Sequence, residues 1–313
     1  MPVQSRLSKN ILNTISYYDI LDFPLTSLEI WKYLTVADGE VMDNDKCSLG
    51  DIVEALEAEE ITKHIEEYRG FYFLRGRKEL VERRIEKDKN SIEKYKIAQK
   101  VAEWLRFVPY VRMVALAGTV AMKNCEPESD IDFLVALESG RIWTGRLLVT
   151  GMVHILGKRR YGDKIRDRIC LNHYIATQSL EIKKKGLFAA GEYSFLYPLL
   201  GFDFYEEFGK SNRQWIGGYK PNYSFDEIKP FRYVEATHAS RVLQNGLERL
   251  INFLGGTRIE TWLKKKQTAR IEKNPLTHKA GGYIEYNDDN LVFLPEPRLD
   301  EEFTKNFVKG LES

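Results

Sequence analysis

The chain has 313 residues, of which 43% are hydrophobic and 30% are charged, and its formal net charge is +1. This length and composition are typical of a globular protein with two or three folding units. A net charge near zero gives the whole molecule no overall electrostatic attraction to nucleic acid or membranes. Three cysteines lie far apart without a Cys-x-x-Cys pair, which argues against a disulfide framework or a zinc site. The most apolar run, residues 147–156, is far shorter than the roughly 20 residues that span a bilayer. We therefore expect a cytoplasmic protein without membrane association.

Residues 1–77 predict a first folding unit. Apolar residues recur at helical spacing near its start, and Ser27 and Ser48 are expected to cap two further short helices. Aromatic residues on both sides of Arg69-Gly70 predict a β-hairpin over residues 61–74. Three helices followed by a hairpin is the order of a winged helix. Residues 1–80, however, contain 9 Lys and Arg against 15 Asp and Glu, which argues against DNA binding and favours a packing or protein-contact role.

The remaining chain predicts three segments, and the whole is expected to be an α+β protein. Residues 78–108 read as one connecting helix, whose charges are expected to form a solvated face. Residues 109–186 alternate between strands and a helix, and they are expected to form the catalytic core. Residues 187–313 are expected to be mainly helical, with a short hairpin near the end. The expected strands are 111–117, 131–137 and 169–176 in the core, with a helix over 142–156, and 283–286 and 291–294 in the hairpin.

The chemistry-bearing residues lie at the ends of the first two core strands. The first strand ends in Gly118-Thr119, where a following helix would leave backbone amides open to a phosphate. The second strand begins with Asp130-Ile131-Asp132, and the two-residue period of a strand places both carboxylates on one face. Two adjacent carboxylates repel each other unless a cation lies between them. Oxygen ligands near a phosphate site favour magnesium, with manganese as an alternative.

In this pattern the sequence resembles the polymerase-β-like nucleotidyltransferase superfamily. The signature of that superfamily is a Gly-Ser pair followed about a dozen residues later by an acid-hydrophobic-acid strand, and here Thr119 replaces the serine. Ser129 also matches the Ser-Asp-hydrophobic-Asp form of the small prokaryotic members. A longer resemblance, to the uncharacterised prokaryotic proteins called predicted nucleotidyltransferases, rests on residues 73–77, 167–172 and 274–278 and covers most of the chain.

The resemblance implies transfer of a nucleoside monophosphate from an NTP, such as ATP, to an acceptor, with release of pyrophosphate. Asp130 and Asp132 would be the catalytic metal ligands. The acceptor is left open as a small molecule, a protein or RNA. Such enzymes usually carry a third carboxylate on a neighbouring strand, where this chain offers Asn172; Asp167 and Glu181 flank that strand as substitutes. The residues expected to contact the nucleotide are Gly118, Thr119, Lys123 and Ser129.

Two other functions remain open on the sequence alone. The missing third carboxylate fits a catalytically degenerate, nucleotide-binding regulatory protein. An Asp-x-Asp pair also occurs in glycosyltransferases that bind a nucleotide sugar through a metal, although that function leaves Gly118-Thr119 unexplained. Around the core, Tyr193, Tyr197 and Asn212 are candidate walls of the nucleotide site. A basic cluster that suits either phosphates, a nucleic-acid acceptor or a solvated surface comprises Arg141, Arg146, Lys158, Arg159, Arg160, Lys164, Arg166 and Arg168.

Overall fold

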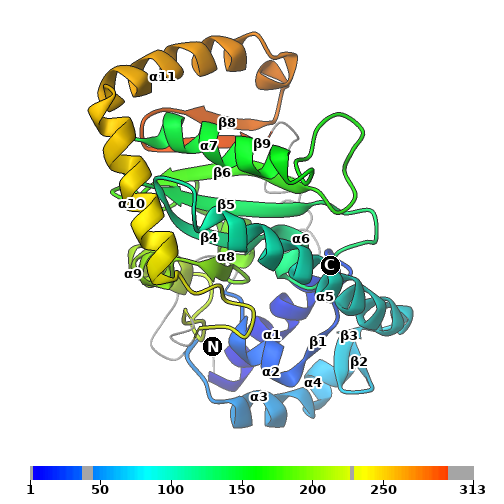
Figure 1. Ribbon diagram of the computed structural model, residues 1–313. Coiled ribbons are helices and arrows are strands. Elements are labelled where there is room, and N and C mark those ends of the chain that lie inside the picture. Colours follow the sequence, from blue (N-terminus) through cyan, green and yellow to red (C-terminus); the bar gives the residue numbers. More distant parts are fainter. Residues whose placement is uncertain (1–2, 37–44, 226–228, 295–313) are drawn as a thin grey trace.

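Two β-sheets organise the chain in a computed structural model, which describes residues 3–36, 45–225 and 229–294 (Figure 1). Over these residues the protein has eleven α-helices, one six-stranded mixed sheet and one three-stranded antiparallel sheet. The expectation of an α+β protein is therefore confirmed. Among the described helices, none combines the length and the apolar character that crossing a membrane requires.

The first part of the chain packs four helices on the three-stranded sheet, whose strand order is β1-β3-β2. The hairpin at Arg69-Gly70 is confirmed, although residues 59–62 before it are helical. Ser48 caps its helix as expected, but Ser27 does not: Thr26 is the cap, and it forms a reciprocal capping box with Glu29. The elements are α1 (Val3–Asp19), β1 (Leu25–Thr26), α2 (Ser27–Lys32), α3 (Leu49–Leu56), α4 (Glu59–Thr62), β2 (Ile65–Tyr68) and β3 (Phe71–Leu74).

A single long helix, α5 (Glu79–Leu105), runs from the three-stranded sheet to the six-stranded sheet (Figure 1), as the sequence predicts. The expectation that its charges form a solvated face is wrong for Arg84, Lys87 and Lys94, which are buried. Each of them forms an ion pair with a carboxylate on another segment. Burial of a charge requires such a partner, so these three residues fasten the helix to the rest of the molecule.

The six-stranded sheet has the order β7-β4-β5-β6-β9-β8, and only the β5–β6 pair is parallel. The three expected core strands are confirmed with their predicted bounds, and so is the hairpin near residue 290. The strand β7 lies in a stretch that we expected to be mainly helical. The strands are β4 (Val111–Ala117), β5 (Ile131–Leu137), β6 (Ile169–Ala176), β7 (Tyr197–Leu200), β8 (Tyr283–Tyr286) and β9 (Asn290–Leu294).

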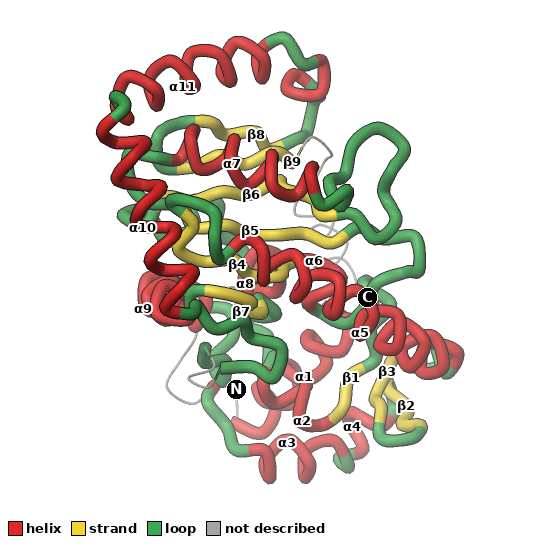
Figure 2. The backbone as a smooth tube through the Cα atoms, viewed as in Figure 1, coloured by secondary structure: helices red, strands yellow, loops and turns green. Residues whose placement is uncertain are grey.

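Helices cover both faces of this sheet (Figure 2), and alternate residues of its strands face two separate cores. Leu116 and Phe133 pack with α5 and α7, whereas Ala115 and Leu134 pack with α8 and α9. The last two helices bend around the side of the sheet (Figure 1). The helices are α6 (Gly118–Ala121), α7 (Ile142–Ile155), α8 (Leu187–Tyr193), α9 (Phe202–Gly217), α10 (His238–Phe253) and α11 (Gly256–Glu272), followed by the 3₁₀ helix η2 (Pro275–His278).

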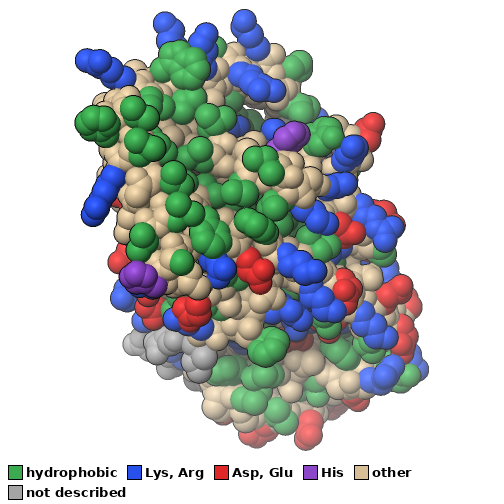
Figure 3. Space-filling view, viewed as in Figure 1, with side chains coloured by type: hydrophobic (Ala, Val, Ile, Leu, Met, Phe, Trp, Pro, Cys, Tyr) green, Lys and Arg blue, Asp and Glu red, His purple; other side chains and the backbone are tan. Residues whose placement is uncertain are grey.

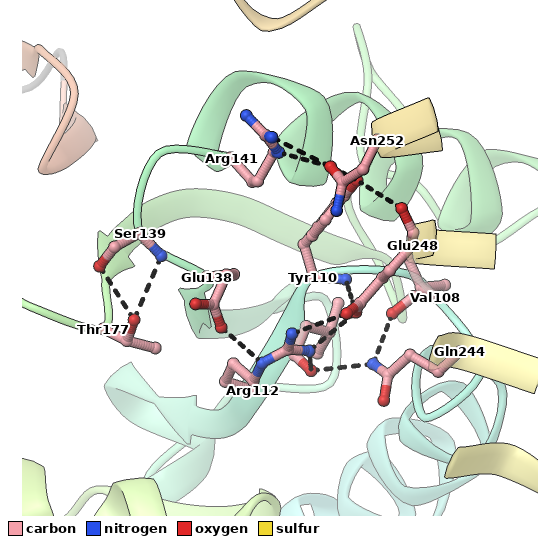
Figure 4. Close-up of polar contacts among 11 residues, drawn as sticks. Val108, Tyr110, Arg112, Glu138, Ser139, Arg141, Thr177, Gln244, Glu248 and Asn252 are labelled. Carbon is pink, nitrogen blue, oxygen red and sulfur yellow. Dashed lines mark hydrogen bonds and ion pairs between the residues drawn. The ribbon is translucent and has the colours of Figure 1, made fainter. Parts of the chain in front are cut away.

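Polar side chains fasten α10 to one end of the sheet (Figure 4). Glu248 accepts two hydrogen bonds of 2.9 Å from the Arg112 guanidinium and one of 2.6 Å from the backbone N–H of Tyr110. Asn252, one turn further along α10, accepts hydrogen bonds from Arg141 and from the Tyr110 hydroxyl. A two-pronged bond between a guanidinium and a carboxylate fixes orientation as well as distance. This network therefore sets the direction in which α10 leads into α11.

Candidate functional site

Three neighbouring strands bring the predicted site residues together at one edge of the six-stranded sheet, namely where β4 ends and where β5 and β6 begin. Because β4 and β5 are antiparallel, the end of β4 at Gly118 meets the start of β5 at Asp132. Because β5 and β6 are parallel, the start of β6 at Cys170 meets the same point. Strand direction alone therefore gathers the glycine and both aspartates in one place.

Asp130 and Asp132 lie close together, and their carboxylate oxygens and the Cys170 sulfur are all within 4.8 Å of one another. Burial, followed by the negative charges of Asp130 and Glu192, raises the pKa of Asp132 to about 7. The Arg160 guanidinium lies against the pair and donates a hydrogen bond of 2.5 Å to Asp130 Oδ2. The aspartates thus concentrate negative charge that one arginine partly neutralises.

Cys170 and Asn172 of β6 both lie beside Asp132. Asp132 is opposite Cys170 and Leu134 is opposite His173, so Leu171 and Asn172 of β6 together lie opposite the single residue Phe133 of β5. This extra residue forms a β-bulge in β6. Asn172 Nδ2 donates a hydrogen bond of 2.9 Å to Asp132 Oδ1. Asn172 thus contacts one aspartate of the pair directly.

The backbone of Gly118 passes close to the Asp132 carboxylate. Its φ is +65°, and a Cβ atom built on it would lie 2.6 Å from Asp132 Oδ2. Only glycine therefore allows the turn after β4 to pass this close to the carboxylate. Thr119, the next residue, is exposed at the same edge.

Two other predicted nucleotide contacts are directed elsewhere. The Lys123 ammonium lies 3.6 Å from the Asp88 carboxylate on α5. The Ser129 hydroxyl accepts a hydrogen bond from the Glu126 backbone N–H, within the loop before β5. Ser129 contributes through its carbonyl oxygen, which accepts a hydrogen bond of 2.8 Å from the buried Lys94 ammonium. Its position next to Asp130 is thus structural, since it holds the loop that delivers the aspartates.

Neither of the two expected substitutes for a third carboxylate reaches the aspartate pair. Asp167 accepts a hydrogen bond of 2.8 Å from Lys94, and Glu181 pairs with Lys185 in an exposed loop. Glu192 on α8 was not identified from the sequence. Its negative charge helps to raise the pKa of Asp132, and it lines the cavity that lies next to this aspartate. No motif marks Glu192, because its approach depends on how α8 packs on the sheet.

A cavity of about 1010 Å³ lies next to Asp132 and is lined by the first residues of β6. Asp132, Asn172 and Glu192 contribute to its lining, whereas Gly118 and Thr119 do not. Of the basic cluster in the sequence, Arg146, Arg159 and Arg160 reach it. The other walls come from the loop at residues 159–162, from α8, from α11 and η2, and from the β8–β9 hairpin.

Among the three polar residues expected to wall the site, only Tyr193 lines this cavity, where its hydroxyl lies 3.3 Å from His173 Nδ1. Tyr197 packs edge to face on Tyr95. Asn212 is fully buried and accepts a hydrogen bond from the backbone of Ile182. Tyr197 is half-buried, and its hydroxyl accepts a hydrogen bond from the backbone N–H of Arg232. Both residues therefore use their polar groups within the fold.

The donor set at the edge fits a magnesium ion better than a soft metal. Asp130 and Asp132 offer carboxylate oxygens, which are the ligands that magnesium prefers. Burial, followed by the charges of both aspartates, raises the pKa of the Cys170 thiol well above its usual range, so the thiol remains protonated near neutral pH. A neutral thiol is a poor ligand for a hard cation.

Comparisons of the chain with protein-family models, with curated proteins and with solved structures gave no match.

Proposed function

We propose that the protein is a magnesium-dependent nucleotidyltransferase that transfers a nucleoside monophosphate from an NTP to an acceptor hydroxyl and releases pyrophosphate. The observation that carries the proposal is the approach of Asp130, Asp132 and Gly118 at one sheet edge, where a Cβ atom on the glycine would lie 2.6 Å from Asp132 Oδ2. Backbone amides that no side chain covers can bind a phosphate, and the paired carboxylates next to them can bind its cation.

In this function Asp130 and Asp132 would hold the magnesium ion, and Gly118 and Thr119 would face the triphosphate. When bound, the ion would neutralise charge on the phosphate oxygens. The acceptor hydroxyl attacks the α-phosphorus, the new O–P bond forms, and the bond to pyrophosphate breaks. Arg160, which donates to Asp130, neutralises part of the negative charge at this edge.

The hydroxyl proton requires a base, and we assign this role to Glu192. Asn172 lies beside Asp132, where the nucleotidyltransferases that the sequence resembles would carry a third carboxylate, and an amide does not take up a proton in this range. Glu192 lines the cavity next to Asp132, and its charge raises the pKa of that aspartate. A carboxylate on α8 would thus replace the one absent from β6.

We assign the finer architecture on the same basis. The order of α1, β1, α2, α3, α4, β2 and β3, with an antiparallel three-stranded sheet, supports a winged-helix-like unit. Its acidic balance favours a protein-contact role. The β4-α6-β5 segment followed by the parallel β6 supports a nucleotidyltransferase-type core.

A second candidate is a nucleotide-binding regulatory protein without turnover. The observation that favours it is the hydrogen bond from Asn172 to Asp132, which uses one carboxylate oxygen of the pair on a neutral amide. Nucleotide binding is common to both candidates. They differ in whether pyrophosphate appears when acceptors are offered.

Calorimetric titration of Mg-ATP, Mg-GTP, Mg-CTP and Mg-UTP tests the proposal without knowledge of the acceptor. We expect at least one nucleotide to bind with a micromolar Kd, roughly −8 kcal/mol, in a magnesium-dependent manner. The double variant Asp130→Asn/Asp132→Asn should lose this binding. The control variant Glu103→Gln/Glu207→Gln, which removes two exposed carboxylates elsewhere, should retain it. Equal binding by both double variants would refute the assigned site, and binding without pyrophosphate release over a broad acceptor panel would favour the regulatory candidate.

A further inference from the structure

Three arginines from separate segments line the cavity beside the aspartates. Arg146 lies on α7, Arg159 follows that helix, and Arg270 lies near the end of α11. Arg159 is held next to the start of β6 by a bridge to Ile169. The three arginines therefore line one space, although they are up to 124 residues apart in sequence.

These arginines are not neutralised by carboxylates among the described residues. Arg146 donates a hydrogen bond of 2.6 Å to the neutral side chain of Gln267 and lies 4.7 Å from the centre of the Phe293 ring. Burial lowers the pKa of Arg146, and the positive charges of Arg159 and Arg270 lower it further. Positive groups that repel one another inside a cavity form a site for an anion.

The arginines and Gly118 lie on opposite sides of the aspartates. In the sheet β4, which leads into Gly118, pairs with one side of β5, whereas β6 pairs with the other. Arg146 contacts Phe293 of β9, which is the strand beyond β6. A triphosphate facing Gly118 would therefore leave the arginines to the second substrate.

We propose that the acceptor is a small molecule with a phosphate group, which Arg146, Arg159 and Arg270 bind while its hydroxyl faces Asp132. This assignment rests on the proposed nucleotidyltransferase function and names the class of its acceptor. The guanidinium group matches phosphate because its planar donors bind two oxygens at once. The hydroxyl oxygen then bonds to the α-phosphorus, pyrophosphate leaves with the electron pair of the broken bond, and the proton passes to Glu192.

The dimensions of the site favour a small acceptor over a nucleic acid. A volume of about 1010 Å³ is at the upper end of the range for small-molecule sites. The cavity is bounded by α8, by α11 with η2, and by the β8–β9 hairpin. Figure 3 shows further basic side chains on the outer surface around α11. A nucleic acid would require a basic groove open along its length.

The test is a calorimetric titration of ribose 5-phosphate, and of unphosphorylated ribose, into the full chain. We expect the phosphate ester to bind and ribose to bind much more weakly. Exchange of all three arginines for glutamine should weaken ribose 5-phosphate binding by about tenfold or more, because charge-assisted hydrogen bonds are lost. A control variant that exchanges the exposed Lys100, Lys210 and Lys265 for glutamine removes the same charge and should bind as the wild type does.

Arg146 is half-buried, so its exchange could prevent the triple variant from folding. The single variant Arg270→Gln changes an exposed residue and tests the proposal in that case. It should weaken binding of ribose 5-phosphate and leave the affinity for Mg-ATP unchanged. Equal affinity for ribose and ribose 5-phosphate would overturn the proposal, as would loss of Mg-ATP binding in the arginine variants. Arginine-dependent binding of a short single-stranded RNA, with none of ribose 5-phosphate, would also overturn it. Arginine-dependent binding of ribose 5-phosphate without any nucleotide binding would instead refute the nucleotidyltransferase function and leave the anion site standing.

Discussion

The side-chain amide of Asn172 lies 2.9 Å from Oδ1 of Asp132 and donates a hydrogen bond to it. This contact puts a neutral group where a third negative charge would complete a three-carboxylate site. Replacing the side-chain amide of Asn172 by a carboxylate would therefore change the charge of the site and leave its shape almost unchanged.

We predict that Asn172→Asp makes the protein more dependent on magnesium. Without the ion, a third carboxylate increases repulsion beside Asp132 and should lower the Tm. With the ion, the added ligand should raise the Tm more than in the wild type, because tighter binding adds stability to the folded state. Melting curves with and without magnesium measure both effects. Asn172→Ala is the control, and an equal magnesium-induced rise in the two variants would contradict the prediction.

We predict that the metal-free protein loses stability as the pH rises from about 4 to 7. The pKa of Asp132 is raised from 3.8 to about 7, so the folded state binds more protons than the unfolded chain in this range. The free energy of unfolding therefore falls with rising pH, and the full destabilisation is present above pH 7. Asp132→Asn should remove this contribution to the slope and be more stable than the wild type at pH 8, because the amide carries no charge at this buried position. Urea denaturation at pH 5 and 8 measures this, with Glu207→Gln as the control; an unchanged slope in Asp132→Asn would reject the assignment.

We predict that Gly118→Ala destabilises the protein and abolishes nucleotide binding. The added Cβ would meet the Asp132 carboxylate at 2.6 Å, and the positive φ adds strain of about 1 kcal/mol. Gly140→Ala is a matched control, because Gly140 also has a positive φ but its Cβ would meet no atom within 4 Å. The difference between the two variants in unfolding free energy isolates the clash with Asp132. Nucleotide affinity of the wild-type level in Gly118→Ala would show that the close approach has no role in binding.

We predict that Lys220 gives the protein a second pH dependence, with the opposite sign. Lys220 is fully buried, and burial lowers its pKa from 10.5 to about 7. Its ammonium donates hydrogen bonds to the Thr35 hydroxyl and to the Tyr33 carbonyl, next to the Tyr17 and Tyr18 rings. The unfolded chain binds more protons between pH 7 and 10.5, so the free energy of unfolding should rise with pH there. Lys220→Met should lose this rise between pH 7 and 9, whereas the exposed Lys210→Met should keep it.

The core strands and the aspartate pair could be predicted from the sequence because their signals are local. Residues 111–117 and 131–137 are nearly continuous apolar runs, which only buried strands or helices tolerate, and the flanking glycine and aspartates limit their length. Strand alternation then places Asp130 and Asp132 on one face without any knowledge of the partners. The bounds of these strands agree with the structure for the same reason.

Features that depend on contacts between distant segments could not be predicted. Arg112 and Glu248 are 136 residues apart, and nothing in either local sequence indicates the other. The burial of Lys94 depends on which side of α5 the other segments cover, since the charges are spread around the helix. Thr26 and Ser27 are both good capping residues, so composition alone does not decide between them. Glu192 reaches the site only because α8 packs on the sheet beside β6.

The strands β4, β5 and β6 carry the site residues, and the strands that pair with them on either side come later in the sequence. β7 pairs with β4, and β9 pairs with β6, so the sheet acquires its last site-adjacent strand only at residue 294. A nascent or truncated chain that ends near residue 186 contains every predicted metal ligand but presents two unpaired strand edges to other molecules. Expression of the core alone should therefore yield aggregates, and the smallest stable form of the site includes the β8–β9 hairpin.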